Sequence, residues 1–376
     1  MAEYLTNTTD LTKVASAIRE KGGTSDSLVY PGGFVTAIQD IQTGTERQII
    51  VTVKSGATVT ATKGSLSVSG TSVNGTCTLI VPEAGTWSVS ATLGGQTSDT
   101  KTVSITDSYS LTLYFVSSTL NNNEWSVIKS VSDAGQGANY WSIGDRKEVT
   151  LNGTVGHLTL SNYTTYAFII GFNHNASVEG TNRIHFQLAK TALSGGKDVC
   201  LCDSSYNSAV STTDYFSMNR SRNNSGGWKS SQMRTNICGT SLSIYSGTII
   251  AVIPAALRAV LKSVTKYTDN TGGGSTAASA VTATTDYFFL LSEYEVFGGI
   301  SYANGNESSK QAQYAYYSAG NSKIKYRYDK TSTTAYWWLR STVAGYSDRF
   351  VDVNRDGGVS VYYADYSYGF APGFCV

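Results

Sequence analysis

The sequence predicts a multi-domain protein that is mainly β, with an α+β part, and three observations support this fold class. The chain has 376 residues, which is enough for two or three domains. It contains 37 glycines and only 4 prolines, and with many serines and threonines this composition favours short strands joined by turns. Apolar residues recur at helical spacing near the amino terminus and mostly alternate after it. We therefore expect a short helical hairpin, then a β-sandwich, then a larger mixed domain.

Residues 1–46 are expected to form the helical hairpin. Asp10 is a good helix cap, and Lys21 and Gly22 end the first helical run. The apolar faces of the two helices would consist of Leu11, Val14, Ala15 and Ile18 in the first and of Phe34, Val35, Ile38 and Ile41 in the second. Such a pair is too small to be stable alone. We expect it to associate with partners, most simply with copies of itself.

The hairpin segment LTKVASAIREKGGTSDSLVYPGGFVTAIQDIQ resembles the amino-terminal segment of many tail-associated proteins of phages of Gram-positive hosts and of related prophage proteins. AIREK and PGGFVTAI are its characteristic pieces. The resemblance implies that residues 1–46 attach the chain to other phage tail proteins, and analogy with other tail fibres implies a homotrimer. A generic two-helix cap is the alternative.

Residues 47–107 are expected to form an immunoglobulin-like β-sandwich. Alternating runs lie near Ile50, Val59, Leu66, Ile80 and Trp87, and turns such as KSGA, TKGS, VNGT and LGGQ separate them. This spacing is typical of a small sandwich. The segment VPEAGTWSVSATLGGQTSDTKTVSI resembles the closing strands of bacterial-type immunoglobulin-like repeats, which places Trp87 in the core. Such modules mostly extend and position another domain, so we expect a spacer.

Residues 108–376 are expected to form one mixed domain. An opening group of strands is expected near Trp125, Trp141–Val149, Tyr166–His174 and Ile184–Lys190. A more helical middle follows, with a helix entry near Trp228 and Met233 and a short helix passing into a strand within IIAVIPAALRAVLKSVTKYT. The Gly-, Ser- and Thr-rich stretch 268–286 is expected to be an exposed, mobile loop.

Residues 336–376 are interpreted as a rigid apolar frame around a tyrosine-rich surface. The frame would consist of Trp337, Trp338, Leu339 and Arg340 at one end and of Phe370, Pro372, Phe374, Cys375 and Val376 at the other. The residues between have the composition of an antibody paratope, in which Tyr supplies rigid amphipathic area and Ser and Asp supply adaptable hydrogen bonds. The stretch therefore predicts a binding surface, with Arg340 in a structural role beside the two tryptophans.

Six motifs of this region, WSIGDRKEV, IIGFNH, W followed by MR, FFLLSEYEVFG, WWLRS and GFAPGF, occur in a fixed order over about 250 residues. Together they resemble a family of phage and gut-bacterial proteins. Its members carry a carboxy-terminal C-type lectin-like domain of the version shared with formylglycine-generating enzymes and with the variable proteins of diversity-generating retroelements. The resemblance implies an α+β domain whose ligand surface lies between the WWLRS strand and the closing PGF strand.

In retroelement-diversified proteins the positions that vary are typically occupied by residues such as Tyr, Ser, Asp and Asn, scattered among fixed residues. A template repeat in the genome would be needed to show that this copy is diversified. The candidate ligand-binding residues that the resemblance implies are Tyr346, Ser347, Asp348, Phe350, Asp352, Asn354, Tyr362, Tyr363, Asp365, Tyr366 and Tyr368.

The sequence offers few candidates for catalysis, so we expect no enzymatic activity, no cofactor and no metal site. The three histidines, His157, His174 and His185, lack ligand spacing and are expected to be structural. An odd number of scattered cysteines, Cys77, Cys200, Cys202, Cys238 and Cys375, indicates reduced, buried thiols. Formylglycine-generating enzymes use cysteines near the end of the domain, but Cys375 lies in an apolar closing strand and is expected to pack there.

One segment, Asp352-Val-Asn354-Arg-Asp356-Gly357, is similar to the first half of an EF-hand calcium loop. The twelfth position of that loop requires a bidentate Glu, and here it is Tyr363. A β-hairpin with its turn near Asp356 and Gly357 accounts for the same residues. We prefer the hairpin, with calcium binding as the alternative.

Charge and hydropathy exclude several classes of partner. The chain has 28 basic and 27 acidic residues, which argues against nucleic acid and against an anionic membrane. No apolar run approaches the roughly 18 residues that span a bilayer, and the amino terminus lacks the features of a signal peptide. We expect synthesis and folding in a host cytoplasm, without membrane insertion.

The expected function is that of a phage tail fibre or tip protein, located in the virion tail, that binds a bacterial cell-surface protein or glycan. Several copies would convert a weak contact into avidity. One alternative is a structural tail or baseplate protein whose tyrosines pack against a virion neighbour. The other is an enzyme of the formylglycine-generating type or a glycan hydrolase.

Overall fold

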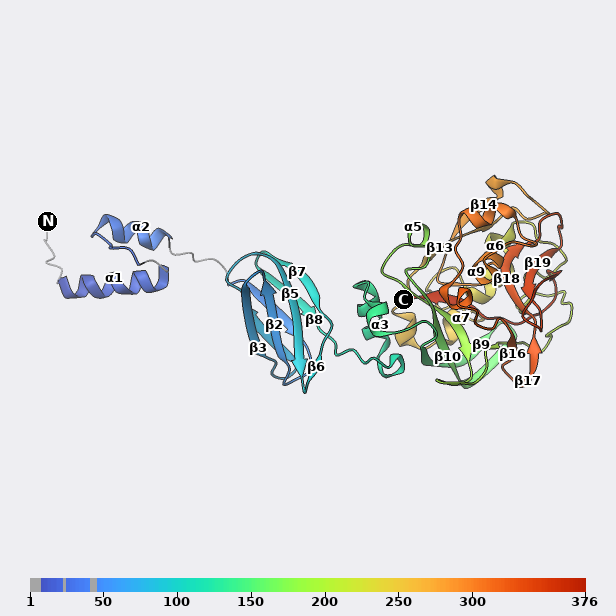
Figure 1. Cartoon of the computed structure of the whole chain (residues 1–376), viewed down its shortest axis with the longest axis horizontal. Coiled ribbons are helices and arrows are strands. Elements are labelled where there is room, and N and C mark those ends of the chain that lie inside the picture. Colours follow the sequence, from blue (N-terminus) through green and yellow to red (C-terminus); the bar gives the residue numbers. More distant parts are fainter. Residues whose placement is uncertain (1–7, 23–24, 41–45) are drawn as a thin grey trace. The chain divides into compact units, whose positions relative to one another are not determined.

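The computed structural model describes residues 8–22, 25–40 and 46–376 (Figure 1). The chain is mainly β, with several sheets and short helices, as its composition predicts. It divides into two units, Met1–Leu113 and Tyr114–Val376. None of the helices in the described ranges is long and apolar enough to cross a membrane.

Two helices, α1 (Thr8–Gly22) and α2 (Gly32–Asp40), form the predicted hairpin. Ala15 and Ile18 of α1 pack against Phe34 of α2, and all three side chains are buried. The helix α1 begins at Thr8, so Asp10 lies in its first turn and is not the cap that the sequence predicted.

Part of the predicted apolar stripe stays exposed on the hairpin. The side chains of Val14, Val35 and Ile38 are each about half exposed, at 48%, 53% and 52%. Ile41, predicted to continue the second stripe, lies outside the described residues. Three buried side chains are a small core, so the exposed stripe is apolar surface that a further partner can cover.

Eight strands make up the rest of the first unit, in two sheets of order β4-β1-β8 and β3-β2-β5-β6, with β7 also paired to β5. Their bounds are β1 (Gln48–Thr52), β2 (Thr58–Lys63), β3 (Leu66–Thr71), β4 (Thr76–Ile80), β5 (Gly85–Leu93), β6 (Gln96–Thr97), β7 (Lys101–Ile105) and β8 (Ser108–Thr112). Burial alternates along β2 and β5, as expected for strands with one face in a core, and Trp87 is fully buried as predicted.

Two details of this unit differ from the prediction. The strand β8 pairs in parallel with β1, so residues 108–112 belong to this unit and not to the following domain. In β4 the buried side chains are Cys77 and Leu79, while Ile80 is 53% exposed. Since side chains of a strand alternate between faces, the strand faces the opposite way from the one that Ile80 suggested.

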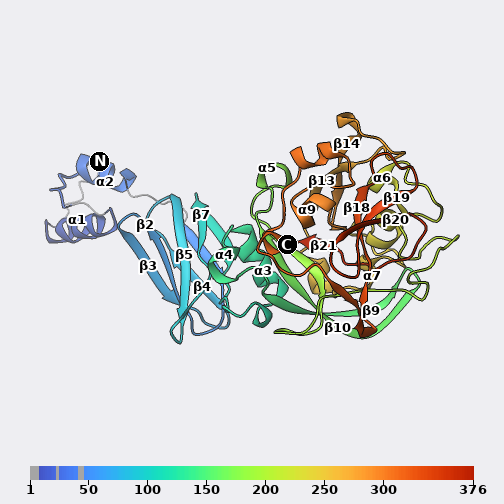
Figure 2. The ribbon, with the colours of Figure 1, turned by 45° about the vertical axis from the view of Figure 1, so that its right-hand side comes forward.

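The second unit is built on a five-stranded sheet of order β15-β21-β11-β10-β9. Figure 2 labels its strands β9, β10 and β21. The bounds are β9 (Arg146–Val155), β10 (Leu158–Phe172), β11 (Ile184–Lys190), β15 (Phe288–Phe289) and β21 (Gly373–Cys375). All seven residues of β11 are buried, which confirms the predicted strand at Ile184–Lys190. The last strand of the chain, β21, pairs with β11 and with β15, so the carboxy terminus lies inside the sheet.

Trp125 begins a helix, α3 (Trp125–Asp133), and not one of the predicted strands. Its buried residues are spaced by three and four positions, which is a helical period. The Trp125 ring lies edge-on to Phe186 of β11, with 5.7 Å between centroids, and 6.2 Å from Phe374 of β21. Its contact with two strands of the central sheet explains why a large aromatic residue begins this helix.

Short helices and small sheets complete the second unit. The helices are α4 (Gly137–Tyr140), α5 (Ala176–Glu179), α6 (Gly227–Ser230), α7 (Ile249–Val252), α8 (Ala255–Arg258), α9 (Glu293–Phe297) and α10 (Ala315–Ser318), with the tighter turns η1 (Leu120–Asn122), η3 (Ala278–Ala280) and η4 (Gly305–Ser309) and the wider π-type turn η2 (Met233–Cys238). The strands are β12 (Val199–Cys200), β13 (Val264–Asp269), β14 (Val281–Asp286), β16 (Lys325–Arg327), β17 (Lys330–Ala335), β18 (Trp337–Thr342), β19 (Arg349–Val353) and β20 (Val359–Tyr363). The predicted helix entry at Trp228 and the helix before the strand β13 are confirmed.

The two ends of the glycine-rich stretch 268–286 belong to the antiparallel pair of β13 and β14, which its composition did not predict. Residues 270–280 between them form the predicted loop, which is largely exposed but packed at its glycines. Gly272 is buried, and a Cβ at this position would lie 1.9 Å from the carbonyl oxygen of Asn224. Gly274 accepts a 3.0 Å hydrogen bond from the amide of Gly345. Glycine is required here because two other segments pack directly on this backbone.

The predicted apolar frame of residues 336–376 is confirmed. Trp337, Trp338 and Leu339 of β18 are fully buried, as are the closing residues Phe374 to Val376. Arg340 is fully buried too, and its guanidinium donates to both carboxylate oxygens of Glu295 in α9. A buried bidentate pair of this kind fixes β18 against α9, which is the structural role that the sequence suggested.

Candidate functional site

The sheet β18-β19-β20 carries part of the predicted binding residues and brings one of its strands to the surface of the second unit. The strands β18 and β19 are almost entirely buried, whereas every residue of β20, which lies at one edge of the sheet, is half-buried. Tyr362 lies opposite Phe350, and Tyr363 lies opposite Arg349. Neighbouring side chains on a strand point to opposite faces of the sheet, so the two tyrosines place aromatic rings on both faces of β20.

Six side chains make up a surface that we call the Tyr–Arg surface: Tyr346, Tyr362, Tyr363, Tyr366, Arg222 and Arg349. The Arg222 guanidinium lies 4.2 Å from the ring centroid of Tyr363, and that of Arg349 lies 4.6 Å from Tyr346 and 5.0 Å from Tyr363. Two guanidinium groups thus lie close to Tyr363. Cations over aromatic rings attract the rings electrostatically and hold them in place.

The two arginines have fixed positions beside acids of the same surface. Nε of Arg222 lies 3.3 Å from Oδ2 of Asp365, and Nε of Arg349 lies 3.5 Å from Oδ1 of Asp348. Half of the Arg222 side chain remains exposed, so part of its guanidinium is accessible to a ligand. The surface therefore offers aromatic faces, cationic donors and carboxylate acceptors within one area.

Tyr368 is the buried support of the exposed tyrosines. Its ring is 1% exposed and lies 5.5 Å from Tyr362, 6.2 Å from Tyr366 and 5.0 Å, almost parallel, from Tyr336. Trp338 of the frame lies 4.8 Å behind it. The exposed rings thus pack on a buried aromatic layer, which limits the conformational freedom that a ligand would have to remove.

Asn224 joins the segments that carry the Tyr–Arg surface. It is fully buried, and its side-chain amide donates to the carbonyl oxygens of Tyr346 and Arg349, both at 2.8 Å. Its Oδ1 accepts from the amide of Gly273 at 2.7 Å. Its own amide donates to the carbonyl of Ser347. The loop that carries Arg222, the loop of Tyr346 and the glycine loop therefore meet at one side chain.

Sequence reasoning missed both Asn224 and Arg222, and no local pattern marks them. They lie more than a hundred positions before the residues they contact, so only the tertiary structure brings them together. The same loop borders a hollow of about 260 Å³ whose lining includes Asn219, Arg220 and Asn223. The loop 219–225 thus extends the polar part of the candidate site beyond residues 336–376.

The predicted site residues divide by exposure. Tyr346 is 51% exposed and Ser347 is exposed, whereas Asp348, Asn354, Tyr362, Tyr363 and Tyr366 are half-buried. Four predicted residues are instead buried: Phe350, Asp352, Asp365 and Tyr368. These four side chains are covered in this structure, contrary to the prediction, because β19 has neighbours on both sides and the turn after β20 folds back against the core. Of the four, Asp365 pairs with Arg222 of the surface.

The segment that is similar to a calcium loop forms the predicted hairpin turn. The amide of Asn354 donates to the carbonyl of Gly358, and Gly357 has a φ of +82°. The Oδ1 atom of Asn354 accepts from the amides of Asp356 and Gly358, both at 2.9 Å. Asp352 is buried between the strands, and burial raises its pKa well above the usual range. The side-chain oxygen of Asn354 is thus occupied within the turn, and the Asp352 carboxylate is buried on β19.

A second cluster of charged residues is buried in the domain, and three of its members, His174, Glu179 and Glu295, have the spacing of metal ligands. However, Nζ of Lys266 lies 2.7 Å from Glu179 and 2.9 Å from Glu295. Its ammonium group occupies the place between the carboxylates that a cation would take. Arg340 holds both oxygens of Glu295 as well. The cluster is therefore a neutralised ionic network that joins α5, β13, α9 and β18.

Burial and charge determine the protonation of this network. Burial alone would raise the pKa of Glu295, but Arg340 and Lys266 outweigh it and hold that pKa well below the usual range. Burial raises the pKa of Glu179 to about 7, against the opposing effect of Lys266. Burial also lowers the pKa of His174 to about 3. His174 is therefore neutral at physiological pH and stacks on Tyr314, at 3.7 Å between centroids.

The five cysteines are free and buried, which confirms their predicted state. Sγ of Cys375 lies 3.2 Å from Nδ1 of His185, and both residues are fully buried. Burial raises the pKa of Cys375 to about 12, so the thiol is protonated and packs inside the closing strand. His157, by contrast, is exposed and stacks on Tyr215 at 4.1 Å.

Comparison with known proteins gives one family match. Residues 206–376 match a family model described as a domain of unknown function (DUF6273). No curated protein matches the chain. The matched segment begins at Tyr206 and contains the whole Tyr–Arg surface together with Asn224 and the glycine loop, so the candidate site lies entirely within the part of the chain that resembles this family.

Proposed function

We propose that this protein is a phage tail receptor-binding protein whose Tyr–Arg surface binds a protein or glycan on the bacterial cell surface. The observation that carries the proposal is a group of tyrosines and arginines at the surface, in which Tyr362 and Tyr366 pack on the buried ring of Tyr368 and Arg222 and Arg349 lie beside Tyr363. Tyr and Arg are enriched at binding hot spots because each offers a large contact area together with polar groups. A surface held in position in the free protein loses little entropy when it binds.

The two units also have proposed fold identities. We assign residues 48–112 to an immunoglobulin-like spacer, supported by two sheets and the buried Trp87. We assign residues 114–376 to a C-type lectin-like domain, supported by the positions of the WWLRS segment in β18 and of the closing strand in β21. An experimental structure superposed on both fold families would check the assignments.

Attachment to the virion is the proposed role of the helical hairpin. Val14, Val35 and Ile38 leave an apolar stripe exposed on α1 and α2. Such a stripe supports association with copies of the chain or with another tail protein. The spacer and the binding domain would then be present in several copies, so that a weak contact gains avidity.

Binding rather than catalysis is the proposed activity. The buried ionic network has no exposed reacting group, because Lys266 and Arg340 occupy its carboxylates. The Tyr–Arg surface holds no nucleophile paired with a base. A purely structural role in the tail is the competing function, and it requires the tyrosines to be covered in the assembled virion.

The test uses the full chain, fluorescently labelled, with cells of the bacterial strain that carries the gene. We expect saturable binding by flow cytometry and competition with phage adsorption by the unlabelled chain. Protease treatment of the cells would abolish binding to a protein receptor, and periodate oxidation would abolish binding to a glycan. Absence of binding to untreated cells, together with tyrosines inaccessible to chemical labelling in intact virions, would overturn the proposal in favour of the structural role.

A further inference from the structure

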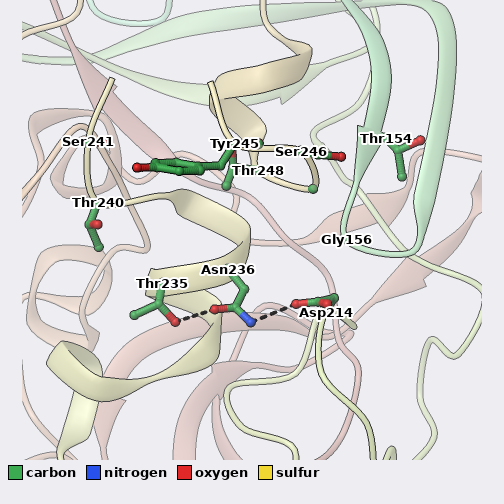
Figure 3. Close-up of a pocket in the computed structure, with 11 residues that line it drawn as sticks. Thr154, Gly156, Asp214, Thr235, Asn236, Thr240, Ser241, Tyr245, Ser246 and Thr248 are labelled. Atoms are coloured by element: carbon green, nitrogen blue, oxygen red, sulfur yellow. Dashed lines mark hydrogen bonds between the residues drawn. The ribbon is translucent and has the colours of Figure 1, made fainter. Parts of the chain in front are cut away.

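A second cavity of the binding domain lies apart from the Tyr–Arg surface. It has a volume of about 650 Å³, within the range of roughly 300–1,000 Å³ that is typical of ligand pockets. Four segments form it: the end of β9 with the turn before β10, the loop at Asp214, the turn η2, and the loop before α7 (Figure 3). The lining residues are Thr154, Gly156, Asp214, Thr235, Asn236, Thr240, Ser241, Tyr245, Ser246, Gly247 and Thr248.

The walls of the cavity are fixed by backbone contacts. The amide of Gly156 donates to the carbonyl of Gly247 at 2.7 Å, and the amide of His157 donates to the carbonyl of Asp214. A Cβ at Gly156 would lie 2.2 Å from the Asp214 oxygen, so only glycine allows this approach. The β9–β10 turn therefore joins the loop before α7 and the Asp214 loop, and the cavity is formed before any ligand binds.

A hydrogen-bonded chain of polar side chains forms one side of the cavity. Thr235 donates to Oδ1 of Asn236 at 2.7 Å, and Nδ2 of Asn236 donates to Oδ1 of Asp214 at 2.8 Å (Figure 3). The Asp214 carboxylate also accepts from the hydroxyl of Thr213. A carboxylate has about four acceptor positions, so two remain for a ligand, and Asn236 keeps a second amide hydrogen.

An aromatic ring faces this polar chain. Tyr245 is 61% exposed, and Figure 3 shows its ring across the cavity from Asn236 and Thr235. The hydroxyl groups of Thr240, Ser241 and Ser246 lie on the same loop region. The cavity thus combines one flat apolar face with many neutral groups that both donate and accept hydrogen bonds.

The side chains that line the cavity favour an uncharged ligand. Asp214 is the one carboxylate among the lining residues that the structure describes, and none of them is Lys, Arg or His. Without cationic donors, an anionic ligand would lie unpaired beside Asp214. An apolar ligand would leave the hydroxyl and amide groups without partners. An uncharged polyhydroxylated ring satisfies both conditions, because its hydroxyls pair with the polar chain and its C–H face packs on Tyr245.

We propose that this cavity binds a neutral monosaccharide unit of a glycan, with Tyr245 against the face of the sugar ring and Asp214 and Asn236 at its hydroxyls. The site goes beyond the proposed receptor contact because it shares no residue with the Tyr–Arg surface. It gives the domain a second binding site. This site would recognise its ligand through neutral hydrogen-bonding groups, whereas the Tyr–Arg surface also offers arginines.

The test is saturation-transfer NMR with the full chain and a panel of methyl glycosides: glucoside, galactoside, mannoside, rhamnoside and N-acetylglucosaminide, with methyl glucuronide as the acidic probe. We expect transfer to at least one neutral glycoside and none to the glucuronide. Tyr245→Ala and Asp214→Asn should each lower the affinity for that glycoside by about tenfold or more, which corresponds to about 1.4 kcal/mol of binding free energy. Ile244→Ala is the matched control, since this neighbour is 63% exposed and does not line the cavity.

Three outcomes would overturn the inference: no transfer to any neutral glycoside, stronger transfer to the glucuronide, or binding that is unaffected by both cavity variants. Tyr245 is mostly exposed, so its variant remains informative if Asp214→Asn fails to fold. A different result would also overturn this site. If the double variant Arg222→Ala with Tyr363→Ala loses binding of the glycoside and Tyr245→Ala retains it, the Tyr–Arg surface is supported as the glycan site instead. The two proposals therefore fail separately.

Discussion

Individual side chains decide whether the Tyr–Arg surface exists as a fixed structure, and Asn224 is the most connected of them. Its amide and carbonyl groups hold the backbones of Tyr346, Arg349 and Gly273. Without it, the part-buried carbonyl of Tyr346 and the amide of Gly273 each lose this partner, while the carbonyl of Arg349 keeps the amide of Val343 as a donor. An unpaired buried polar group costs roughly 1–3 kcal/mol.

Asn224→Ala should therefore lower the free energy of unfolding by about 2–3 kcal/mol and weaken binding to bacterial cells further than the loss of folded protein explains. Urea unfolding and cell binding, measured on the same preparations, check this. Asn139→Ala is the control, since Asn139 is exposed in α4 and lies outside the candidate site. If both variants bind like the wild type per folded molecule, Asn224 does not position the surface.

The buried histidine His174 predicts how the second unit responds to acid. Burial lowers its pKa from 6.5 to about 3, so the folded protein resists protonation that the unfolded chain accepts. This contribution to stability is complete above pH 6.5 and is lost as the pH falls from 6.5 towards 3. Glu179 and Glu307, whose pKa values burial raises to about 7, act in the opposite direction over roughly pH 4.5 to 7.

Comparison with His174→Phe isolates this histidine, because phenylalanine can keep the stacking on Tyr314 and cannot be protonated. As the pH falls from 7.5 to 4.5, the free energy of unfolding of the variant should rise by roughly 2 kcal/mol relative to that of the wild type. Urea midpoints at the two pH values measure the difference. A constant difference across this range would show that His174 titrates normally in the folded protein.

Among the elements, the glycine loop between β13 and β14 is the clearest example of structure that supports the site from a distance. Gly272 and Gly273 both have a φ of +63°, so alanine is strained equally at either position. Only at Gly272 would the added Cβ collide with backbone, 1.9 Å from the Asn224 oxygen, while Gly273 has open space.

Gly273→Ala should therefore lower the free energy of unfolding by about 1–2 kcal/mol through backbone strain. Gly272→Ala should lower it by at least about 2 kcal/mol more, because its Cβ also collides with backbone. Thermal unfolding of the two variants measures the contrast. Equal losses would mean that the loop does not pack on Asn224 in solution, and the proposed support of the Tyr346 loop would then lack its basis.

Elements with a strong local pattern could be predicted from the sequence, and those defined by distant contacts could not. The run Ile184–Lys190, the core position of Trp87 and the hairpin turn at Asn354–Gly358 all follow from residues within one turn or strand. Trp125, expected from the sequence in a strand, begins the helix α3, whose buried residues have helical spacing. The strand β8 was missed because its partner β1 lies about sixty positions earlier.

The candidate site shows the same limit. Composition found the tyrosines, since Tyr beside Ser and Asp is unusual for a core. It could not separate the half-buried Tyr363 from the buried Tyr368, because both stand in the same run of residues and the packing of Tyr336 and Trp338 covers the second. Arg222 and Asn224 come from a loop that no local pattern connects with residues 336–376.

For the whole molecule, the proposal requires that the helical hairpin joins several copies of the chain. Light scattering of the full chain should give a trimer, and Val35→Glu with Ile38→Glu should give a monomer, because charge on the exposed stripe opposes its burial. Gln39→Glu, an exposed change on the same helix, should leave the trimer intact. A monomeric wild-type chain would remove avidity from the proposed function.

The proposed function itself depends on the tyrosines at the edge of β20. Cell binding of the full chain should fall at least about tenfold in Tyr362→Ala with Tyr363→Ala, while Tyr109→Ala, an exposed tyrosine of the first unit, should bind like the wild type. Circular dichroism and the unfolding midpoint would show that all three proteins are folded. If the folded double variant binds the cells as tightly as the wild type, the Tyr–Arg surface is not the receptor-binding site.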